Sequence, residues 1–206
     1  MMPCRWWFFT LMPALLAGCA SLIFPSGKAP VYYQLDYQSP LVRCSRAFHQ
    51  GVRVWKFVTS SPYDRTEMVV LQPDGQVRFS SGFQWVASPG TLVAESLQQD
   101  LTASALFPQV VSPDNPTVVP LELTGHVFVY AWERGGLASW AALSVEVSLV
   151  NTRTPRKVIF RREYSLKSGP FVEDTSAAFA RAMSALVSQF SEKLQRDLCA
   201  ARATSP

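Results

Sequence analysis

The sequence has few of the residues and motifs that carry chemistry. Its 206 residues include two histidines and four cysteines, and no two cysteines are spaced as Cys-x-x-Cys. This supply cannot complete a Cys/His zinc set, so we expect no metal site. The sequence also lacks nucleophile elbows, His-Glu-x-x-His pairs, phosphate-binding loops and Gly-x-Gly-x-x-Gly turns. We therefore predict no catalytic residues and a protein that is not an enzyme.

Long apolar runs and clusters of one charge sign are also scarce. No apolar run reaches the length of about 18 residues that a membrane-spanning helix needs. The 19 Lys and Arg residues are scattered and leave a net charge of only +4, so no nucleic-acid partner is expected. A hydrophobic content of 48% with 17% charged residues argues against disorder. These properties indicate a folded domain, and the N-terminal segment that precedes it has to be considered separately.

Residues 1–18 have the features of a signal peptide. Arg5 precedes an uncharged stretch, Trp6–Gly18, which is too short to cross a bilayer as a stable helix. The stretch ends in Leu16-Ala17-Gly18-Cys19, which resembles the bacterial lipobox. Small residues at 17 and 18 admit a peptidase, and the Cys19 thiol then takes the lipid. The alternative is an ordinary signal peptide that a cysteine happens to follow.

Cleavage before Cys19 would leave a lipid-anchored protein. Each buried methylene of a palmitate-type chain contributes about 0.8 kcal/mol, and two or more chains anchor stably. Ala20 stands where Asp would favour the inner membrane, so the expected location is the periplasmic face of the outer membrane. Residues 19–30 then form a lipidated tether. No cofactor is expected beyond the covalent lipid on Cys19.

Two cysteines, Cys44 and Cys199, remain after the signal peptide and the lipid are accounted for. Because the periplasm is oxidising, their pairing as a disulfide is predicted. A bond closing so long a loop is worth at most about 5 kcal/mol in the chain-entropy model. Two separate buried thiols are the alternative.

Hydrophobic periodicity predicts one α+β domain over residues 31–200. One helix is expected at about 89–106, because Ser88 can cap it, Pro89 can take its first position, and one apolar stripe follows: Leu92, Val93, Leu97, Leu101 and Ala105. A second is expected from Asp174 or Thr175 to about 198, with apolar residues at helical spacing: Phe179, Met183, Leu186, Phe190, Leu194 and Leu198. A frayed tail is expected at 201–206. Strands are expected at 31–37, 51–59, 68–71, 77–85, 121–132, 140–150 and 158–166, with a hairpin at Pro73-Asp74-Gly75. The economical arrangement is a largely antiparallel sheet with both helices packed on one face. A free edge at 121–132 would let copies pair into a homo-oligomer.

Four segments occur in an order that resembles the ABC-type transport auxiliary lipoprotein family, which includes the PqiC-like outer-membrane lipoproteins. The segments are Tyr32-Tyr33-Gln34-Leu35-Asp36, Ser61-Pro62-Tyr63-Asp64-Arg65, Phe83–Pro89 and Leu97–Phe107. The resemblance covers residues 31–198. Two positions depart from it: Leu71 stands where the family often has Arg, and Ala105 where it often has Gly.

The resemblance implies a non-enzymatic component of a lipid-transport system that spans the periplasm. Its partners would be an MCE-domain protein and the ABC transporter that works with it. The chain would then be the adaptor at the outer-membrane end. The alternative is a carrier that holds an acyl chain in its own groove.

Several aromatic and loop residues are candidates for contact with a partner or a lipid: Tyr63, Asp64, Arg65, Trp85, Trp132 and Trp140. The tryptophans lie at predicted strand ends, where they either pack in the core or line an apolar surface. The loop residues either order their own turn or present an aromatic ring and two charges to a partner. His126, on the polar side of its strand, is expected to be solvated or hydrogen-bonded rather than a base.

Overall fold

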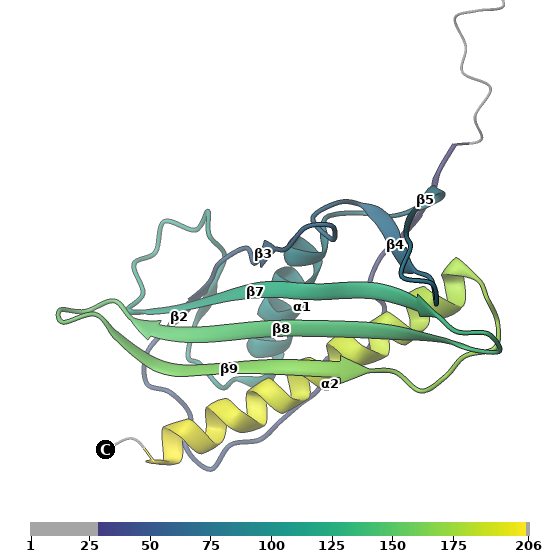
Figure 1. The fold of residues 1–206 in the computed structure, drawn as a ribbon. Helices are drawn as coiled ribbons and strands as arrows, with labels where there is room; N and C mark the ends of the chain where they lie inside the picture. The colour runs from purple at the N-terminus through teal and green to yellow at the C-terminus, as the bar shows by residue number, and fades with distance from the viewer. Residues whose placement is uncertain (1–28, 205–206) are drawn as a thin grey trace, which may run out of the picture.

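The three longest strands form a continuous antiparallel ladder in the computed structural model, which describes residues 29–204 (Figure 1). They are β7 (Leu121–Arg134), β8 (Ser139–Asn151) and β9 (Lys157–Lys167). The predicted signal peptide, Cys19 and most of the tether lie outside the described residues. Alternating apolar residues put one face of this ladder in the core.

The second edge of β7 is occupied by three short strands that follow one another along it. They are β2 (Val52–Val54), β3 (Val58–Thr59) and β4 (Glu67–Leu71), all parallel to β7. Phe57 separates β2 from β3, and its ring lies where a side chain at Gly125 would otherwise stand. Because β7 is paired on both edges, the predicted free edge at 121–132 is wrong.

Three further strands complete a nine-stranded mixed sheet. β5 (Val77–Trp85) is antiparallel to β4, β1 (Val31–Tyr33) is parallel to β5, and β6 (Val110–Val111) is parallel to β2. The predicted hairpin joins β4 to β5, with Gly75 at a φ of 83° that glycine adopts without strain.

Both helices lie on the same face of the sheet (Figure 1). α1 (Pro89–Ser104) begins at the predicted proline, and α2 (Ser176–Thr204) begins after Thr175, whose Oγ1 accepts a hydrogen bond from the Ala178 N–H. The predicted tail at 201–206 is helical as far as Thr204, and residues 205–206 are outside the described part.

The core fills the space between the helices and the sheet. Its largest fully buried side chains come from both layers: Trp85, Leu97, Leu101, Leu121, Leu123, Tyr130, Leu143, Leu149, Phe179 and Phe190. The predicted apolar stripe of the C-terminal helix, from Phe179 to Leu198, is buried throughout. The predicted α+β fold with two helices on one face is therefore confirmed. The sheet is mixed because the short strands join β7 in parallel.

α1 ends one residue before a strained position. Ala105, predicted within the apolar stripe, is instead exposed and has a left-handed φ of 52°. A Cβ in this conformation costs about 1 kcal/mol or more, which glycine avoids. Glycine would therefore fit this position with less strain than alanine.

Replacing Ala105 with glycine should relieve this strain. We expect Ala105→Gly to raise the free energy of unfolding in urea by about 1 kcal/mol. Ala103→Gly is the matched control, because Ala103 is exposed but helical, and glycine there should lower stability by about 1 kcal/mol. Equal effects of the two substitutions would contradict the helix end assigned here.

Candidate functional site

An extended strap, residues 33–44, runs along α2 in the same direction as the helix. Hydrogen bonds fasten it in register: the Tyr33 hydroxyl with Ser176 Oγ at 3.0 Å, the Asp36 N–H to Ser184 Oγ at 3.1 Å, the Val42 N–H to Gln195 Oε1 at 3.4 Å, and Gln195 Nε2 to the Pro40 carbonyl at 3.2 Å. These partners explain why an otherwise apolar helix face carries buried Ser184 and Gln195.

The strap ends at a disulfide between Cys44 and Cys199. Their Cα atoms are 5.5 Å apart and the two residues are separated by 155 positions. The structure thus contains the predicted pairing. Since Cys199 is near the end of α2, the bond joins the start of the domain to its last helix and holds the strap at its C-terminal end.

The middle of the strap is anchored to the other helix. The Tyr37 hydroxyl donates a hydrogen bond of 2.8 Å to Asp100 Oδ2 on α1, and Asp100 is only 1% exposed. Burial, with the nearby Asp100 carboxylate as the second cause, holds the pKa of Tyr37 well above its usual value. Tyr37 therefore stays a protonated donor to the buried carboxylate.

This fastening determines where the chain enters the domain. The described part begins with Ala29 and passes directly into β1, beside β5. The bond between Tyr33 and Ser176 places this entry point next to the start of α2 (Figure 1). A lipid on Cys19 would accordingly anchor the protein through a tether that joins the domain at this end.

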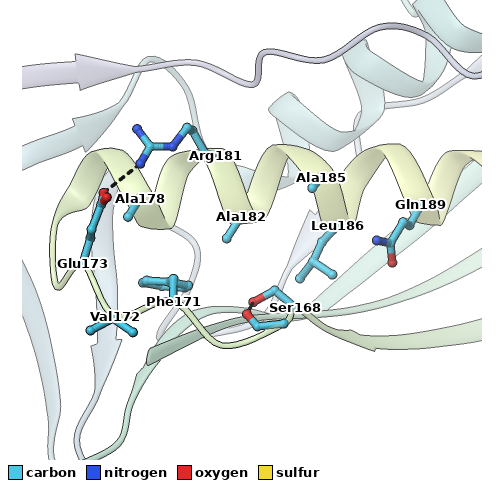
Figure 2. A pocket seen from close by; sticks show the side chains of 11 residues that line it. Ser168, Phe171, Val172, Glu173, Ala178, Arg181, Ala182, Ala185, Leu186 and Gln189 are labelled. Atoms are coloured by element: carbon cyan, nitrogen blue, oxygen red, sulfur yellow. Dashed lines mark hydrogen bonds and ion pairs between the residues drawn. The ribbon is translucent and has the colours of Figure 1, made fainter. Parts of the chain in front are cut away.

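A groove of about 530 Å³ lies between α2 and the loop that follows β9 (Figure 2). Phe171, Ala182 and Leu186 make its middle apolar, and the alanines of α2 leave room above the loop. Arg181 and Glu173 form an ion pair of 2.9 Å at one end. Both charged side chains are about 70% exposed, so the pair adds little stability. The groove is therefore open to solvent, with an apolar middle and charged or polar side chains at its ends.

Two of the predicted contact residues are core residues. Trp85 is 1% and Trp132 is 4% exposed. Trp132 stacks on Phe179 with ring centroids 5.4 Å apart, and Trp85 meets Tyr130 edge-on. Their large apolar surfaces are already covered by α2 and the sheet, so the prediction that they contact a partner or lipid is wrong.

Two other predicted contact residues, Trp140 and Tyr63, are both close to Glu133. Trp140 is half-buried and is the cross-strand neighbour of Glu133 in the β7–β8 ladder. The Lys167 Nζ lies over its ring, 4.8 Å from the ring centroid. Tyr63 is buried near the same glutamate; burial first, and Glu133 second, raise the pKa of Tyr63. Glu133 is thus close to both Tyr63, in the loop, and Trp140, on β8. Their spacing in the sequence did not predict this.

The remaining loop candidates have different roles. Arg65 donates from Nε to the Pro62 carbonyl at 2.8 Å, and its guanidinium lies 3.8 Å from the Phe79 ring centroid. It therefore orders its own turn. Asp64 is exposed and forms no hydrogen bond or ion pair with the described residues, so it stays available to a partner.

His126 makes the hydrogen bond expected of it. Its Nε2 lies 2.7 Å from Ser60 Oγ, and its ring stacks on Phe128 at 4.4 Å. Among the described residues no carboxylate hydrogen-bonds the histidine, as a catalytic triad would require. Residues 29–204 also contain no group of three His, Cys, Asp or Glu placed to hold a metal, and no helix there is long and apolar enough to cross a membrane.

A family model described as the ABC-type transport auxiliary lipoprotein component matches residues 33–195. The chain belongs to this family. The match extends from the start of the strap almost to its disulfide on α2, so it covers nearly all of the folded body. The family description is that of a lipoprotein component of transport rather than an enzyme.

Solved structures agree with the fold of this auxiliary lipoprotein. A DUF330-family protein from Xanthomonas campestris is 14% identical, with a TM-score of 0.74 over 83% of this chain and 95% of its own. An uncharacterised protein is 18% identical, with a TM-score of 0.63 over 83% and 99%. A PelC dodecamer from Paraburkholderia phytofirmans is more distant, at 13% identity and a TM-score of 0.48 over 82% and 95%. No curated protein sequence matches significantly.

The anchoring of the strap can be tested with two tyrosines, the partly buried Tyr37 and the buried Tyr130. Tyr37→Phe should lower the free energy of unfolding by about 2–3 kcal/mol, because it leaves the buried Asp100 carboxylate without its donor. Tyr130→Phe is the control: its hydroxyl is buried and has no hydrogen-bond partner among the described residues, so we expect a change within about 1 kcal/mol. A larger loss for Tyr130→Phe than for Tyr37→Phe in urea titrations would contradict this account.

Proposed function

We propose that this lipoprotein is the outer-membrane auxiliary component of an ABC/MCE-type system that moves lipids between membranes. The observation that carries the proposal is the family match over residues 33–195, which begins shortly after the lipobox at Leu16–Cys19. Ala20 supports the outer membrane over the inner one. The proposed partners are an MCE-domain protein and its ABC transporter, with the domain acting as adaptor between that conduit and the outer membrane.

The proposed mechanism is positional. Ala29, the first described residue, follows Cys19 by ten positions, and a fully extended chain spans at most about 36 Å over that distance. The strap does not add to the length of the tether, because hydrogen bonds and the Cys44–Cys199 disulfide hold the strap on α2. Confinement near one leaflet raises the effective concentration of the adaptor for a conduit that ends there.

The sheet face away from the helices is the proposed partner surface. It carries Trp140 with Glu133 and Lys167, and neither helix covers it (Figure 1). Aromatic residues such as Trp140 are enriched at the centres of protein interfaces. Asp64 adds an accessible charge from the nearby loop.

Site-specific cross-linking in the native host tests this proposal. A photo-reactive benzoylphenylalanine at Trp140 should capture an MCE-domain protein, identified by mass spectrometry. The same residue at Gln99, exposed on α1, is the control and should capture at least several-fold less. Removing the anchor with Cys19→Ala should reduce capture from position 140 by tenfold or more. Absence of any MCE-domain protein from both positions would contradict the adaptor function.

A carrier function is the second candidate, and the groove along α2 is the observation that favours it. An acyl chain would lie against Phe171, Ala182 and Leu186, with polar groups at the ends. Such a protein would accept lipid from the conduit rather than only position it.

Native mass spectrometry separates the two functions. A carrier should retain phospholipid after purification in mild detergent, and Ala182→Trp should abolish retention by filling the groove. Ala103→Trp, exposed on α1, should retain lipid as the unchanged protein does. A protein that carries no phospholipid, or one that Ala182→Trp leaves fully loaded, would contradict the carrier function.

A further inference from the structure

Six of the exposed large apolar side chains lie in the same half of the domain. We call this set the apolar end, and its members are 40–95% exposed: Val31, Tyr32, Phe83, Val86, Leu137 and Val172. Single exposed apolar residues are ordinary on a protein surface, but several large ones at one end require a partner or a lipid to cover them.

Three chain segments bring these residues to the same end. β1 pairs with the outer part of β5, so Val31 lies opposite Phe83. Leu137 is in the hairpin between β7 and β8, and next to it Ser139 forms a bridge with Phe171, which precedes Val172. The Tyr33–Ser176 bond joins β1 to the start of α2, which follows the Val172 loop. These contacts place the three segments in the half of the domain that contains the end of β7 and the start of α2.

The tether enters the domain at this same end. Val31 and Tyr32 follow Cys19 by only 12 and 13 residues. We propose that the apolar end rests on the anchoring membrane, with its aliphatic side chains in the lipid leaflet and the Tyr32 ring at the headgroup level. This inference rests on the proposed lipidation of Cys19, and it adds a second, non-covalent contact with the same bilayer.

The chemistry of this end suits a lipid surface. Tyrosine is enriched at membrane interfaces because its ring is apolar and its hydroxyl is polar. Two pairs of nearby charges compensate each other: Arg134 with Asp174 at 2.9 Å, and Arg181 with Glu173. A bilayer can therefore approach these four side chains without leaving any one of them as an isolated charge.

The opposite end offers a contrast. Val118 is 93% exposed, in the loop before β7 begins. β7 has 14 residues and is about 45 Å long, so Val118 lies far from the apolar end. Contact of both ends with one membrane is therefore not expected.

Fluorescence quenching in vesicles tests the orientation of the full mature lipoprotein. Vesicles of phosphatidylethanolamine and phosphatidylglycerol carry bromine on their acyl chains, and bromine quenches a nearby tryptophan. The emission of the unchanged protein, which has tryptophans of its own, is subtracted. The remaining emission of Tyr32→Trp should then be quenched at least twofold more than that of Val118→Trp. A flotation assay establishes which protein is bound to vesicles.

Each outcome is decisive. Stronger quenching of Tyr32→Trp in floating protein supports the inference. Equal quenching of both reporters in floating protein overturns the inference and leaves the anchored adaptor intact. Protein that does not float overturns both the inference and the lipid anchor.

A second variant tests whether the separate segments act on one surface. Leu137→Asp with Val172→Asp, added to Tyr32→Trp, should reduce the quenching by at least half, since charges cannot enter the leaflet. Val118→Asp, added in the same way, should leave the quenching unchanged. Circular dichroism verifies that each variant is folded, and an unchanged signal in the folded Leu137→Asp, Val172→Asp variant would contradict a shared surface.

Discussion

The fastening of residues 33–44 to α2 is the constraint on which the rest of the structure depends. Serine and glutamine side chains inside an apolar helix face accept and donate to the strap, and a disulfide closes its far end. Tyr37 adds a bond to the buried Asp100 on α1. The strap therefore joins both helices. It also determines the end of the domain at which the N-terminal tether enters.

The sheet explains how the two faces of the domain acquire different roles. One face is covered by α1 and α2, and the buried Trp85 and Trp132 belong to this core. The other face carries Trp140 and a row of ion pairs, including Glu133–Lys167 and Glu146–Arg161. Because β7 is paired on both edges, an association of copies would have to use another edge. Homo-oligomerisation stays a prediction.

Local patterns predicted the long elements well. The helical spacing from Phe179 to Leu198 and the Ser88-Pro89 start need no distant partner, and the same holds for the turn at Gly75. Very short strands are defined only by partners far along the chain. Periodicity therefore predicted β2 and β3 as one strand at 51–59 and missed β6. The groove depends on the packing of the 168–173 loop against α2, which no local pattern encodes. Buried Ser184 and Gln195 were the available signal for the strap, since polar residues on an apolar stripe require partners.

The central claim is that the folded domain works while covalently held to a lipid leaflet through Cys19. Intact-mass analysis of the protein purified from membranes of its native host tests this claim most directly. The account predicts a chain that begins at Cys19 and carries the added mass of several acyl chains. A chain of unmodified mass, recovered free of the membrane, would contradict it.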